Sequence, residues 1–387
     1  MKTLVTGACG FVGQHLLKLL IDDKCGRIID ESSVGLWNSQ DAQDSQDAHD
    51  GQVTRGSQDA RDTQNSQDKQ EHLLGIDIRQ SGTRDTDIFP GSNQPLLDAL
   101  KSASLQGKVS FKFEYVQADL TDRKRVDEII RFYKPDRIYH LAAQASVKYS
   151  WANPVETFQT NVFGGIYLLE ALKRYCPECK MLIVCTAEEY GEAENGNTDA
   201  IREEFKINPS NPYAISKASL DFFASTFQKV NNLNIYISRS FNHIGPGQSD
   251  SFVTSDFARQ IAEIETDLRQ PVIHVGNIDV CRDFLDVRDV VRAYECIIQK
   301  GRPGQAYNVC SGKKRKISEI LDILLALSIK KNISIKVDAI KLRPIDIKVI
   351  YGDNSKLKKE TGWEAVIDIN RSLKDILNWW RERSAQN

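Results

Sequence analysis

The sequence predicts a doubly wound α/β sheet, in which crossover helices join parallel strands, followed by a smaller C-terminal lobe. Three observations predict this fold class. Strand-like apolar runs alternate with helical patterns through the first 240 residues, and a glycine motif follows the first of these runs. After residue 240 the alternation loosens into loops and shorter elements. Such alternation is typical of a parallel sheet with helices on both faces.

The expected elements follow one another in a regular order. Strands are predicted over 3–6, 111–117, 137–142, 181–185 and 235–240, and helices from 11 onward, over 123–133, 154–175, 212–230 and near 373–383. We therefore expect a sheet domain over residues 1–240 and a second lobe over 241–387, with boundaries that are discontinuous along the chain.

The second strand is ambiguous because a polar repeat interrupts this part of the chain. Residues 39–68 divide into the hexads SQDAQD, SQDAHD, GQVTRG, SQDARD and TQNSQD, in which Val53 is the only large aliphatic residue. Such a tract cannot offset its ordering entropy, so we interpret 39–70 as a disordered insertion. Expansion of a short DNA repeat explains it more simply than a binding role. The second strand lies at 33–38 or at 73–79.

The composition excludes several classes of partner. Lysine and arginine number 51 against 53 acidic residues, and no long run of one sign falls in an expected element, so neither nucleic acid nor a membrane is an expected partner. The N-terminus enters a strand without signal-peptide features, and the 8 cysteines are scattered, which predicts a reduced, cytoplasmic protein. Cys176 and Cys179 form a lone CxxC, for which we expect no metal.

The stretch TGACGFVG, residues 6–13, is the first candidate site. Gly7, Gly10 and Gly13 follow a strand and open a helix. There, missing Cβ atoms let the backbone approach a pyrophosphate, and the helix start offers unpaired N–H groups. A plain tight turn is the alternative, but the placement in the first βα turn favours dinucleotide binding.

The residue that contacts the ribose should end the second strand. We prefer 73–79, because Asp77 there could accept hydrogen bonds from ribose hydroxyls and Arg79 could meet a 2′-phosphate. The sequence therefore does not separate NADP(H) from NAD(H). Asp119, at the end of the third strand, is a candidate contact on the adenine side or, equally, a helix cap.

Tyr213 and Lys217 form a second candidate site. Asn211 and Pro212 supply an N-cap and a first-turn proline, so the two side chains stand one turn apart at a helix start. The Lys217 ammonium and the helix dipole should then lower the pKa of the phenol. Such a tyrosine suits proton exchange with a carbonyl or an alcohol. The alternative is an ordinary surface pair.

Thr186 and Glu188 follow a later strand, in CTAEEYG, residues 185–191. In open α/β sheets ligands bind just beyond the carboxyl ends of the strands. Thr186 is thus placed to hydrogen-bond a reacting oxygen, and Glu188 is a candidate acid or base. A polar loop opening without chemistry is the alternative.

Several segments together resemble the extended short-chain dehydrogenase/reductases that act on nucleotide sugars. They are TGACGFVG (6–13), HLAAQASV (140–147), TNVFGG (160–165), CTAEEYG (185–191), NPYAISKASLD (211–221) and RDFLDVRD (282–289). The resemblance implies a Rossmann-type sheet with a smaller C-terminal substrate-binding lobe. It covers nearly the whole chain except the hexads. Segment 238–265 is most similar to the reductases of a GDP-linked 4-keto-6-deoxymannose.

The resemblance also implies roles for individual residues. Thr186, Tyr213 and Lys217 would form the catalytic triad. Cofactor contacts would come from Gly7, Gly10, Phe11, Val12, Gly13, Asp77, Arg79, Asp119, Leu120, Leu141, Ala142, Ala143, Tyr213 and Lys217. The substrate would be held by Gln144, Ser146, Glu188, Asn242, Arg282 and Arg343. The two arginines would bind the diphosphate, since guanidinium forks match phosphate oxygens; a surface salt bridge is the alternative for each.

The expected activity is reduction of the C4 ketone of that GDP-sugar to GDP-D-rhamnose with NADP(H) or NAD(H). A GDP-mannose 4,6-dehydratase, or another nucleotide-sugar epimerase or dehydratase, is the first alternative. Ala187 argues against dehydration, because related dehydratases carry a polar or acidic residue at that position. A catalytically silent nucleotide-binding scaffold is the remote alternative, and the intact Thr186, Tyr213 and Lys217 argue against it.

The resemblance implies a homodimer as well. Relatives commonly pair through the two long helices that correspond here to 154–175 and 212–230. The apolar residues of these helices suit either that interface or the core; they are Phe163, Tyr167, Leu168, Phe222 and Phe223.

Overall fold

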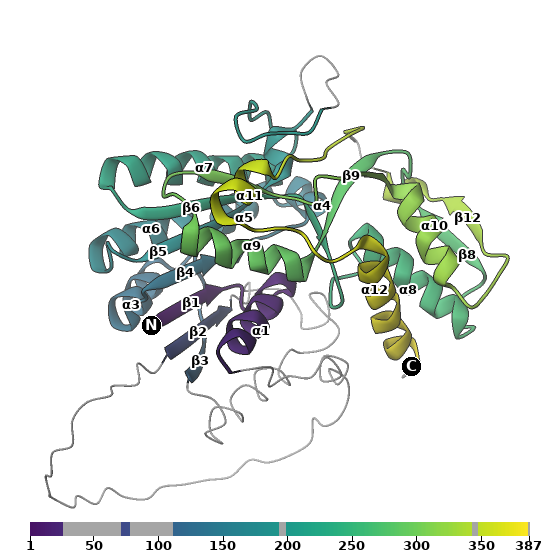
Figure 1. Cartoon of the computed structure of the whole chain (residues 1–387), viewed down its shortest axis with the longest axis horizontal. Coiled ribbons are helices and arrows are strands. Elements are labelled where there is room, and N and C mark those ends of the chain that lie inside the picture. Colours follow the sequence, from purple (N-terminus) through teal and green to yellow (C-terminus); the bar gives the residue numbers. More distant parts are fainter. Residues whose placement is uncertain (26–70, 78–110, 193–198, 343–346, 386–387) are drawn as a thin grey trace, which may run out of the picture.

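The main sheet of the computed structural model has seven parallel strands in the order β10-β6-β5-β4-β1-β2-β3 (Figure 1). The structure describes residues 1–25, 71–77, 111–192, 199–342 and 347–385. The strands of this sheet are β1 (Lys2–Thr6), β2 (Glu71–Asp77), β3 (Phe111–Gln117), β4 (Arg137–His140), β5 (Lys180–Thr186), β6 (Asn234–Ser240) and β10 (Ala306–Val309). The strand order reverses between β1 and β4, which confirms the doubly wound fold and creates a crevice beyond the strand ends.

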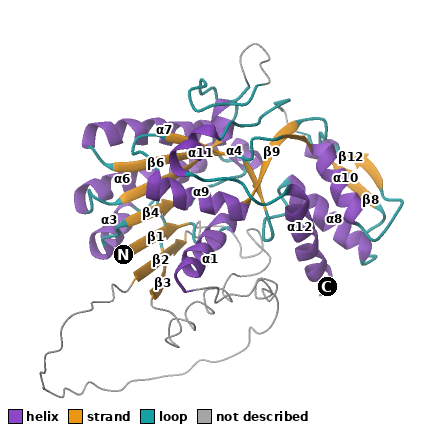
Figure 2. Cartoon of the chain, viewed as in Figure 1, coloured by secondary structure: helices purple, strands orange, loops and turns teal. Residues whose placement is uncertain are grey.

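Helices cover both faces of this sheet (Figures 1 and 2). One face carries α3 (Arg123–Tyr133), α6 (Gly164–Tyr175) and α7 (Pro212–Asn231), and the other carries α1 (Phe11–Cys25) and α9 (Val287–Lys300). Adjacent strand residues supply the two cores: Val5 packs in the cluster with α1 and α9, whereas Leu4 packs in the cluster with α3, α6 and α7. This alternation explains the continuous apolar runs of the central strands.

A third apolar cluster builds the C-terminal lobe, which lies beside the sheet in Figure 1. Its elements are α8 (Val253–Glu265), β8 (Val272–Val275), α10 (Ile317–Leu327), β12 (Ser334–Val337) and α12 (Ile369–Ser384). A small sheet of β7 (Asn242–Ile244), β9 (Cys281–Asp286) and β11 (Lys314–Lys316) adjoins it. The chain then returns to the main sheet through α9 and β10, so residues beyond 240 contribute to both parts. The division at 240/241 stays a prediction.

The helix predicted over 154–175 is a run of three segments. They are α5 (Pro154–Phe158), a π-helical turn (Gln159–Phe163) and α6. Helical periodicity does not reveal a single wide turn, and such turns often occur at functional sites. Shorter elements complete the described chain: α4 (Val147–Ala152), the 3₁₀ turns Ala187–Tyr190 and Ala339–Lys341, and α11 (Ser355–Thr361).

The segment preferred for the second strand is confirmed as a strand. β2 pairs in parallel with β1 on one side and with β3 on the other. The competing segment 33–38 and the hexads lie outside the described residues.

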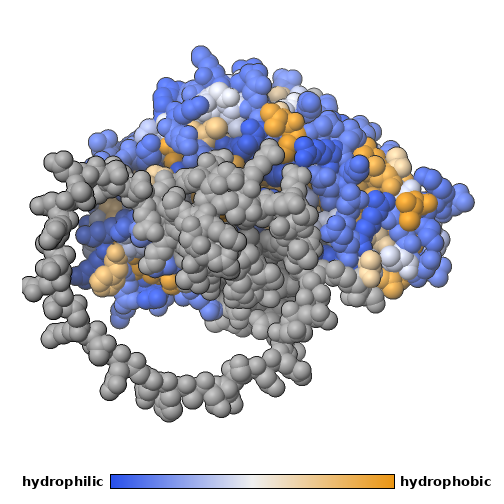
Figure 3. All heavy atoms as spheres, turned by 60° about the horizontal axis from the view of Figure 1, so that its bottom comes forward, coloured by the Kyte–Doolittle hydropathy of each residue, from blue (hydrophilic) through white to orange (hydrophobic). Residues whose placement is uncertain are grey.

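Among the described helices, none is long and apolar enough to cross a bilayer. Hydrophilic residues dominate the coloured part of the face in Figure 3, where apolar residues gather in small patches. Cys176 and Cys179 of the CxxC are free thiols.

Candidate active site

The turn after β1 is built by close backbone contacts. Gly7 has φ +71°, and a Cβ atom on it would lie 2.8 Å from Ala142 N in the loop after β4. A Cβ atom on Gly13 would lie 2.1 Å from Gly7 O, whereas one on Gly10 would meet only Gly7 O, at 3.2 Å. Glycine at these positions therefore lets the backbone of the turn pack closely on itself and on the loop after β4. This geometry fits a dinucleotide pyrophosphate.

The side chains of the neighbouring residues serve packing. The ring of Phe11 stacks on that of His243 at 6.3 Å between centroids, and Val12 packs against the core under α1. Leu120 is 1% exposed and contacts Gly164, so its side chain belongs to the core as well. A cofactor bound here would therefore contact the main-chain atoms of Phe11, Val12 and Leu120, not their side chains. N–H groups in the first turn of α1 have no acceptor within the helix.

The loop after β4 is held against the β1 turn. Thr6 Oγ1 accepts a hydrogen bond from Ala142 N at 3.3 Å and pairs with His140 Nδ1 at 2.8 Å. Leu141 N donates to Thr6 O at 3.2 Å. These bonds hold Leu141 and Ala142 beside β1, and the cofactor contacts expected at Leu141, Ala142 and Ala143 stay predictions.

The predicted contacts to the adenosine half are only partly described. Asp77 ends β2, and Arg79 lies outside the described residues. Asp119 Oδ1 accepts hydrogen bonds from Thr121 N and Thr121 Oγ1, at 2.8 and 2.7 Å. Asp122, not Asp119, is the N-cap of α3, so the capping alternative for Asp119 is wrong. Its role on the adenine side stays a prediction.

Thr186 and Tyr213 lie together beyond the end of β5. Thr186 is buried, and its hydroxyl caps the 3₁₀ turn by accepting from Glu188 N at 3.3 Å. Burial is the main cause that raises the pKa of the Tyr213 phenol; the negative charge of Glu188 raises it further, and a hydrogen bond with the Thr186 side chain lowers it. The phenol is therefore protonated at neutral pH.

Lys217 stands one turn beyond Tyr213 on α7, as predicted. It is 3% exposed, and its Nζ donates to Val184 O at 2.7 Å. Burial lowers the pKa of its ammonium. The sequence predicted that Lys217 would lower the pKa of the Tyr213 phenol; the pKa is instead raised, by burial first and by the charge of Glu188 next.

Glu188 is tied to the start of α7. Asn211 Nδ2 donates to Glu188 Oε2 at 2.8 Å, while Asn211 Oδ1 accepts from Ala214 N at 2.9 Å as the helix cap. One side chain thus fixes both the candidate acid or base and the helix that carries Tyr213. The sequence identified Asn211 only as a cap.

Asn161, in the π-helical turn, is a positioning residue that received no role from the sequence. Its side chain accepts from Gln144 N at 2.8 Å and donates to Gln144 O at 3.0 Å. It also donates to Ser216 Oγ at 2.9 Å, next to Lys217. Asn161 therefore holds the loop after β4 and the catalytic helix together.

The predicted substrate residues fall into two groups. Gln144 Nε2 donates to Ser146 O at 2.9 Å, and the Ser146 hydroxyl caps α4 by accepting from Tyr149 N. On the other side, Asn242 of β7 is opposite Phe284 of β9, so Asn242 and Arg282 share one face of the small sheet. Along the chain, Gln144 and Ser146 follow the end of β4, and Asn242 follows the end of β6.

Arg282 is not a surface residue. It is 8% exposed, and its Nη1 donates to Cys281 O and Ile347 O at 2.9 and 2.7 Å. The surface salt-bridge alternative is therefore wrong for Arg282. Arg343 lies outside the described residues.

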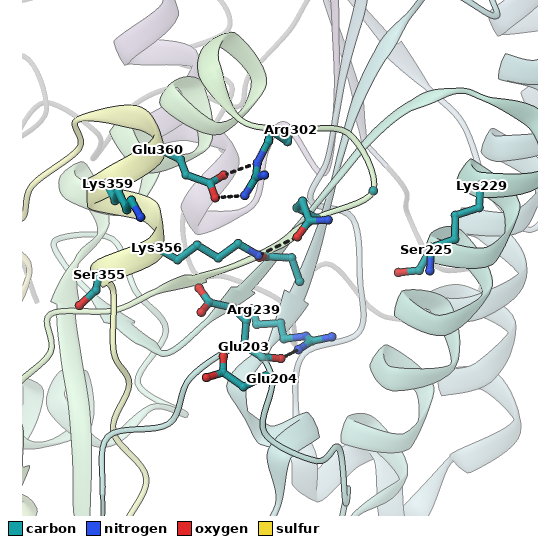
Figure 4. A pocket seen from close by; sticks show the side chains of 13 residues that line it. Glu203, Glu204, Ser225, Lys229, Arg239, Arg302, Ser355, Lys356, Lys359 and Glu360 are labelled. Carbon is teal, nitrogen blue, oxygen red and sulfur yellow. Dashed lines mark hydrogen bonds and ion pairs between the residues drawn. The ribbon is translucent and has the colours of Figure 1, made fainter.

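A separate cavity of about 600 Å³ opens between α7, α11 and β10 (Figure 4). It is lined by Glu203, Glu204, Ser225, Lys229, Arg239, Arg302, Gly304, Gln305, Ala306, Ser355, Lys356, Lys359 and Glu360. Many of its charges are satisfied within the protein: Arg302 pairs with Glu360, and Lys356 donates to Ala306 O at 2.8 Å. Thr186, Tyr213 and Lys217 do not line this cavity.

Comparison with known proteins places these features in a family. Residues 87–376 match the family model described as GDP-mannose 4,6 dehydratase. The GDP-6-deoxy-D-mannose reductase of Pseudomonas aeruginosa is 37% identical over 249 residues, which span 64% of this chain and 81% of that protein. A probable dTDP-glucose 4,6-dehydratase of Sinorhizobium fredii is 31% identical over 283 residues, 70% of this chain and 79% of that protein.

A solved structure gives the same result for the fold. RMD from Pseudomonas aeruginosa complexed with NADPH superposes with a TM-score of 0.70 at 28% identity, and the match covers 99% of each chain.

Proposed function

The chain belongs to the GDP-mannose 4,6-dehydratase family of extended short-chain dehydrogenase/reductases, and from this membership we propose that it reduces the C4 ketone of GDP-4-keto-6-deoxy-D-mannose to GDP-D-rhamnose. The 37% identity to a GDP-6-deoxy-D-mannose reductase supports that substrate. The observation that carries the reaction type is the Tyr213 phenol, whose raised pKa keeps it a proton donor.

The residues of the site have separate roles in this reaction. Bound at the β1 turn and in the crevice beside Lys217, the nicotinamide cofactor supplies the hydride. Tyr213 gives its proton to the alkoxide that develops at C4, and Thr186 hydrogen-bonds the same oxygen. Lys217 holds positive charge behind the phenol and stabilises the tyrosinate left after proton transfer. Arg282 and Asn242 hold the nucleotide sugar, with Arg282 at its diphosphate.

The test is loss of nicotinamide absorbance when the purified chain and NADPH or NADH meet GDP-4-keto-6-deoxymannose, which a separate dehydratase generates in place. We expect rapid oxidation that depends on the sugar and a GDP-D-rhamnose product. The same assay ranks the two cofactors. Tyr213→Phe should lose about a thousandfold in kcat, since it removes the general acid, while cofactor affinity stays unchanged.

A GDP-mannose 4,6-dehydratase is the second candidate, and the placement of Glu188 beside Tyr213 favours it. Dehydration needs both an acid and a base close to the sugar. Ala187 supplies neither, and Glu189 is 0% exposed with Oε1 bound to Thr186 N at 3.0 Å. Formation of the 4-keto sugar from GDP-mannose, without consumption of added cofactor, would replace the reductase proposal.

We propose that the chain forms a homodimer through α6 and α7. Phe163, at the end of the π-helical turn before α6, is 46% exposed, and Phe222 on α7 is 57% exposed, whereas Leu168 on α6 is 1% exposed and belongs to the core. Tyr167 and Phe223 are partly buried against the core. Light scattering should give the mass of a dimer, and Phe222→Asp should halve it. Phe132→Asp is the matched control, because Phe132 is 77% exposed on α3.

The cysteines support a reducing compartment, and we propose a cytoplasmic protein. Cys179, Cys185, Cys281 and Cys310 are free and buried. Free thiols are typical of proteins kept reduced by glutathione and thioredoxin. Location of a fluorescent fusion in intact cells, with a cytoplasmic marker as reference, tests this proposal.

A further inference from the structure

Two buried carboxyl groups lie directly beneath the catalytic threonine. Glu189 and Asp221 are 0% and 1% exposed, and their oxygen atoms lie within 4.8 Å of one another and of Cys185 Sγ. Arg239 Nε is 2.8 Å from Asp221 Oδ2 and 3.7 Å from Glu189 Oε2. The cluster thus sets two acids against one guanidinium.

Arg239 cannot move to serve both acids equally. Its Nη1 donates to Glu203 O at 2.9 Å and to Tyr190 Oη at 3.2 Å, on the side of the cavity in Figure 4. These contacts, with the short bond to Asp221, fix the guanidinium. Because it already occupies the charge-compensating position of the cluster, Arg239 disfavours a metal ion there.

Glu189 has one oxygen in use and one that lacks a donor. Oε1 accepts from Thr186 N at 3.0 Å, and Oε2 is a buried atom without a hydrogen-bond partner. An ionised carboxylate in that position leaves a buried acceptor unsatisfied, which is costly. A proton on Oε2 turns this atom into a donor that faces the carboxylate of Asp221.

We propose that Glu189 and Asp221 share one proton, and that the neutral Glu189 carboxyl positions Thr186 for the reduction. The proposal rests on the proposed function only for its catalytic consequence. Protonation leaves Oε1 free to accept from Thr186 N, so the backbone that carries the catalytic hydroxyl stays fixed. Glu189 thereby acts through Thr186 and does not touch the substrate.

The surroundings of Glu189 support the neutral form. The groups that face it are Cys185 on β5, Tyr190 in the same 3₁₀ turn, Tyr213, Lys217 and Asp221 on α7, and Arg239 on β6. Burial is the largest cause that raises the pKa of Glu189 well above its ordinary value, and the charge of Asp221 raises it further. Arg239 and the bond from Thr186 N oppose these effects without reversing them.

Infrared spectroscopy of the full chain tests the shared proton without substrate. At neutral pH the wild type should show a protonated-carboxyl C=O stretching band that shifts in ²H₂O and disappears in Glu189→Gln. Glu204→Gln, at an exposed glutamate, is the control and should leave the band in place. If wild type and Glu189→Gln do not differ in this region, the shared proton is wrong.

Kinetics test the positioning role. Glutamine keeps an acceptor for Thr186 N and a donor toward Asp221, so Glu189→Gln should retain kcat within about threefold. Glu189→Leu removes the acceptor and should lower kcat by about ten- to a hundredfold with the cofactor KM unchanged. If Glu189→Gln is as slow as a folded Glu189→Leu, or if Glu189→Leu keeps full kcat, the positioning role is wrong. Should the leucine variant not fold, the glutamine variant and the infrared band still decide.

Discussion

The cofactor end and the catalytic end of the crevice are built from different materials. At the turn after β1, absent Cβ atoms let backbone meet backbone, as where Gly7 contacts Ala142. Beyond β5, Glu189 of the 3₁₀ turn, Asp221 of α7 and Arg239 of β6 meet in a buried polar cluster, in which Glu189 accepts a hydrogen bond from Thr186 N. The turn after β1 depends on glycines that lack a Cβ atom. The cluster beyond β5 depends on the charges and the protonation state of its buried side chains. Substitutions should therefore damage the two ends in different ways.

After Tyr213→Phe, the largest effect should come from removal of the Thr186 hydroxyl. Thr186→Val keeps the shape of the side chain but removes the hydrogen bond to the reacting oxygen, so kcat should fall about a hundredfold. Thr186→Ser retains the hydroxyl and the cap of the 3₁₀ turn, and it should stay within about threefold of the wild type. Steady-state kinetics at saturating cofactor provides the measurement. Equal losses in both variants would mean that the methyl group, not the hydroxyl, matters.

At the turn after β1, addition of one methyl group should weaken cofactor binding. Gly13→Ala would place a Cβ 2.1 Å from Gly7 O and 2.7 Å from Ala8 O, so the backbone of the turn must shift. Overpacking of this kind costs about 1–3 kcal/mol, and we expect that loss in cofactor affinity. Gly10→Ala, whose Cβ meets only Gly7 O at 3.2 Å, should disturb the turn less. Calorimetric titration with NADPH compares the two variants. Tighter NADPH binding by Gly13→Ala than by the wild type would mean that close packing in this turn does not serve cofactor binding.

Asn161 connects the two ends, and its loss should cost stability. Asn161→Ala leaves Gln144 N and Gln144 O without their side-chain partner in a partly buried place, which should lower the free energy of unfolding by about 2 kcal/mol. Asn370→Ala is the control, because Asn370 Nδ2 donates to Asp368 at the exposed start of α12. Urea denaturation measures both variants. A loss of stability no larger than that of Asn370→Ala would show that the hydrogen bonds of Asn161 to Gln144 are not needed for stability.

The last effect is a change in how stability depends on pH. Glu189 has a folded pKa above its unfolded value, so the folded chain binds a proton that the unfolded chain releases. Between those two pKa values, the free energy of unfolding should therefore fall as pH rises, by about 1.4 kcal/mol per pH unit relative to Glu189→Gln. Urea midpoints from pH 5.5 to 7.5 measure this difference. Parallel curves for the two proteins would mean that Glu189 is ionised in the fold.

Local patterns explain what could be predicted from the sequence. The glycine motif and the Tyr213–Lys217 pair are local patterns, and their immediate sequence context indicated the elements that carry them: a preceding strand for the first, and Asn211 with Pro212 for the second. The strand and helix boundaries followed from apolar periodicity for the same reason. The identity of β2 was predicted as well, because segment 73–79 offered Asp77 and Arg79 as cofactor contacts where the competing segment 33–38 did not.

The buried cluster could not be predicted, because its contacts join separate elements. Arg239 meets Asp221 across 18 residues, and Glu295 meets Arg137 across 158. Spacing along the sequence does not predict such pairs. The prediction for the pKa of Tyr213 was wrong for a related reason. The sequence shows the neighbour Lys217 at i+4, but burial of the phenol and its closeness to Glu188 depend on the tertiary fold.

The position of β10 has a consequence for folding during synthesis. β6 pairs with β5 on one side and with β10 on the other, where Ile237 N donates to Gln305 O and Phe241 N to Val309 O. β6 leaves the ribosome first and waits as an unpaired edge while α8, β9 and α9 are made. Exposed edges of this kind invite pairing with other chains. The nascent polypeptide therefore completes its cofactor domain only after much of the second lobe has emerged, and a chaperone that shields β6 in that interval should raise the yield of folded enzyme.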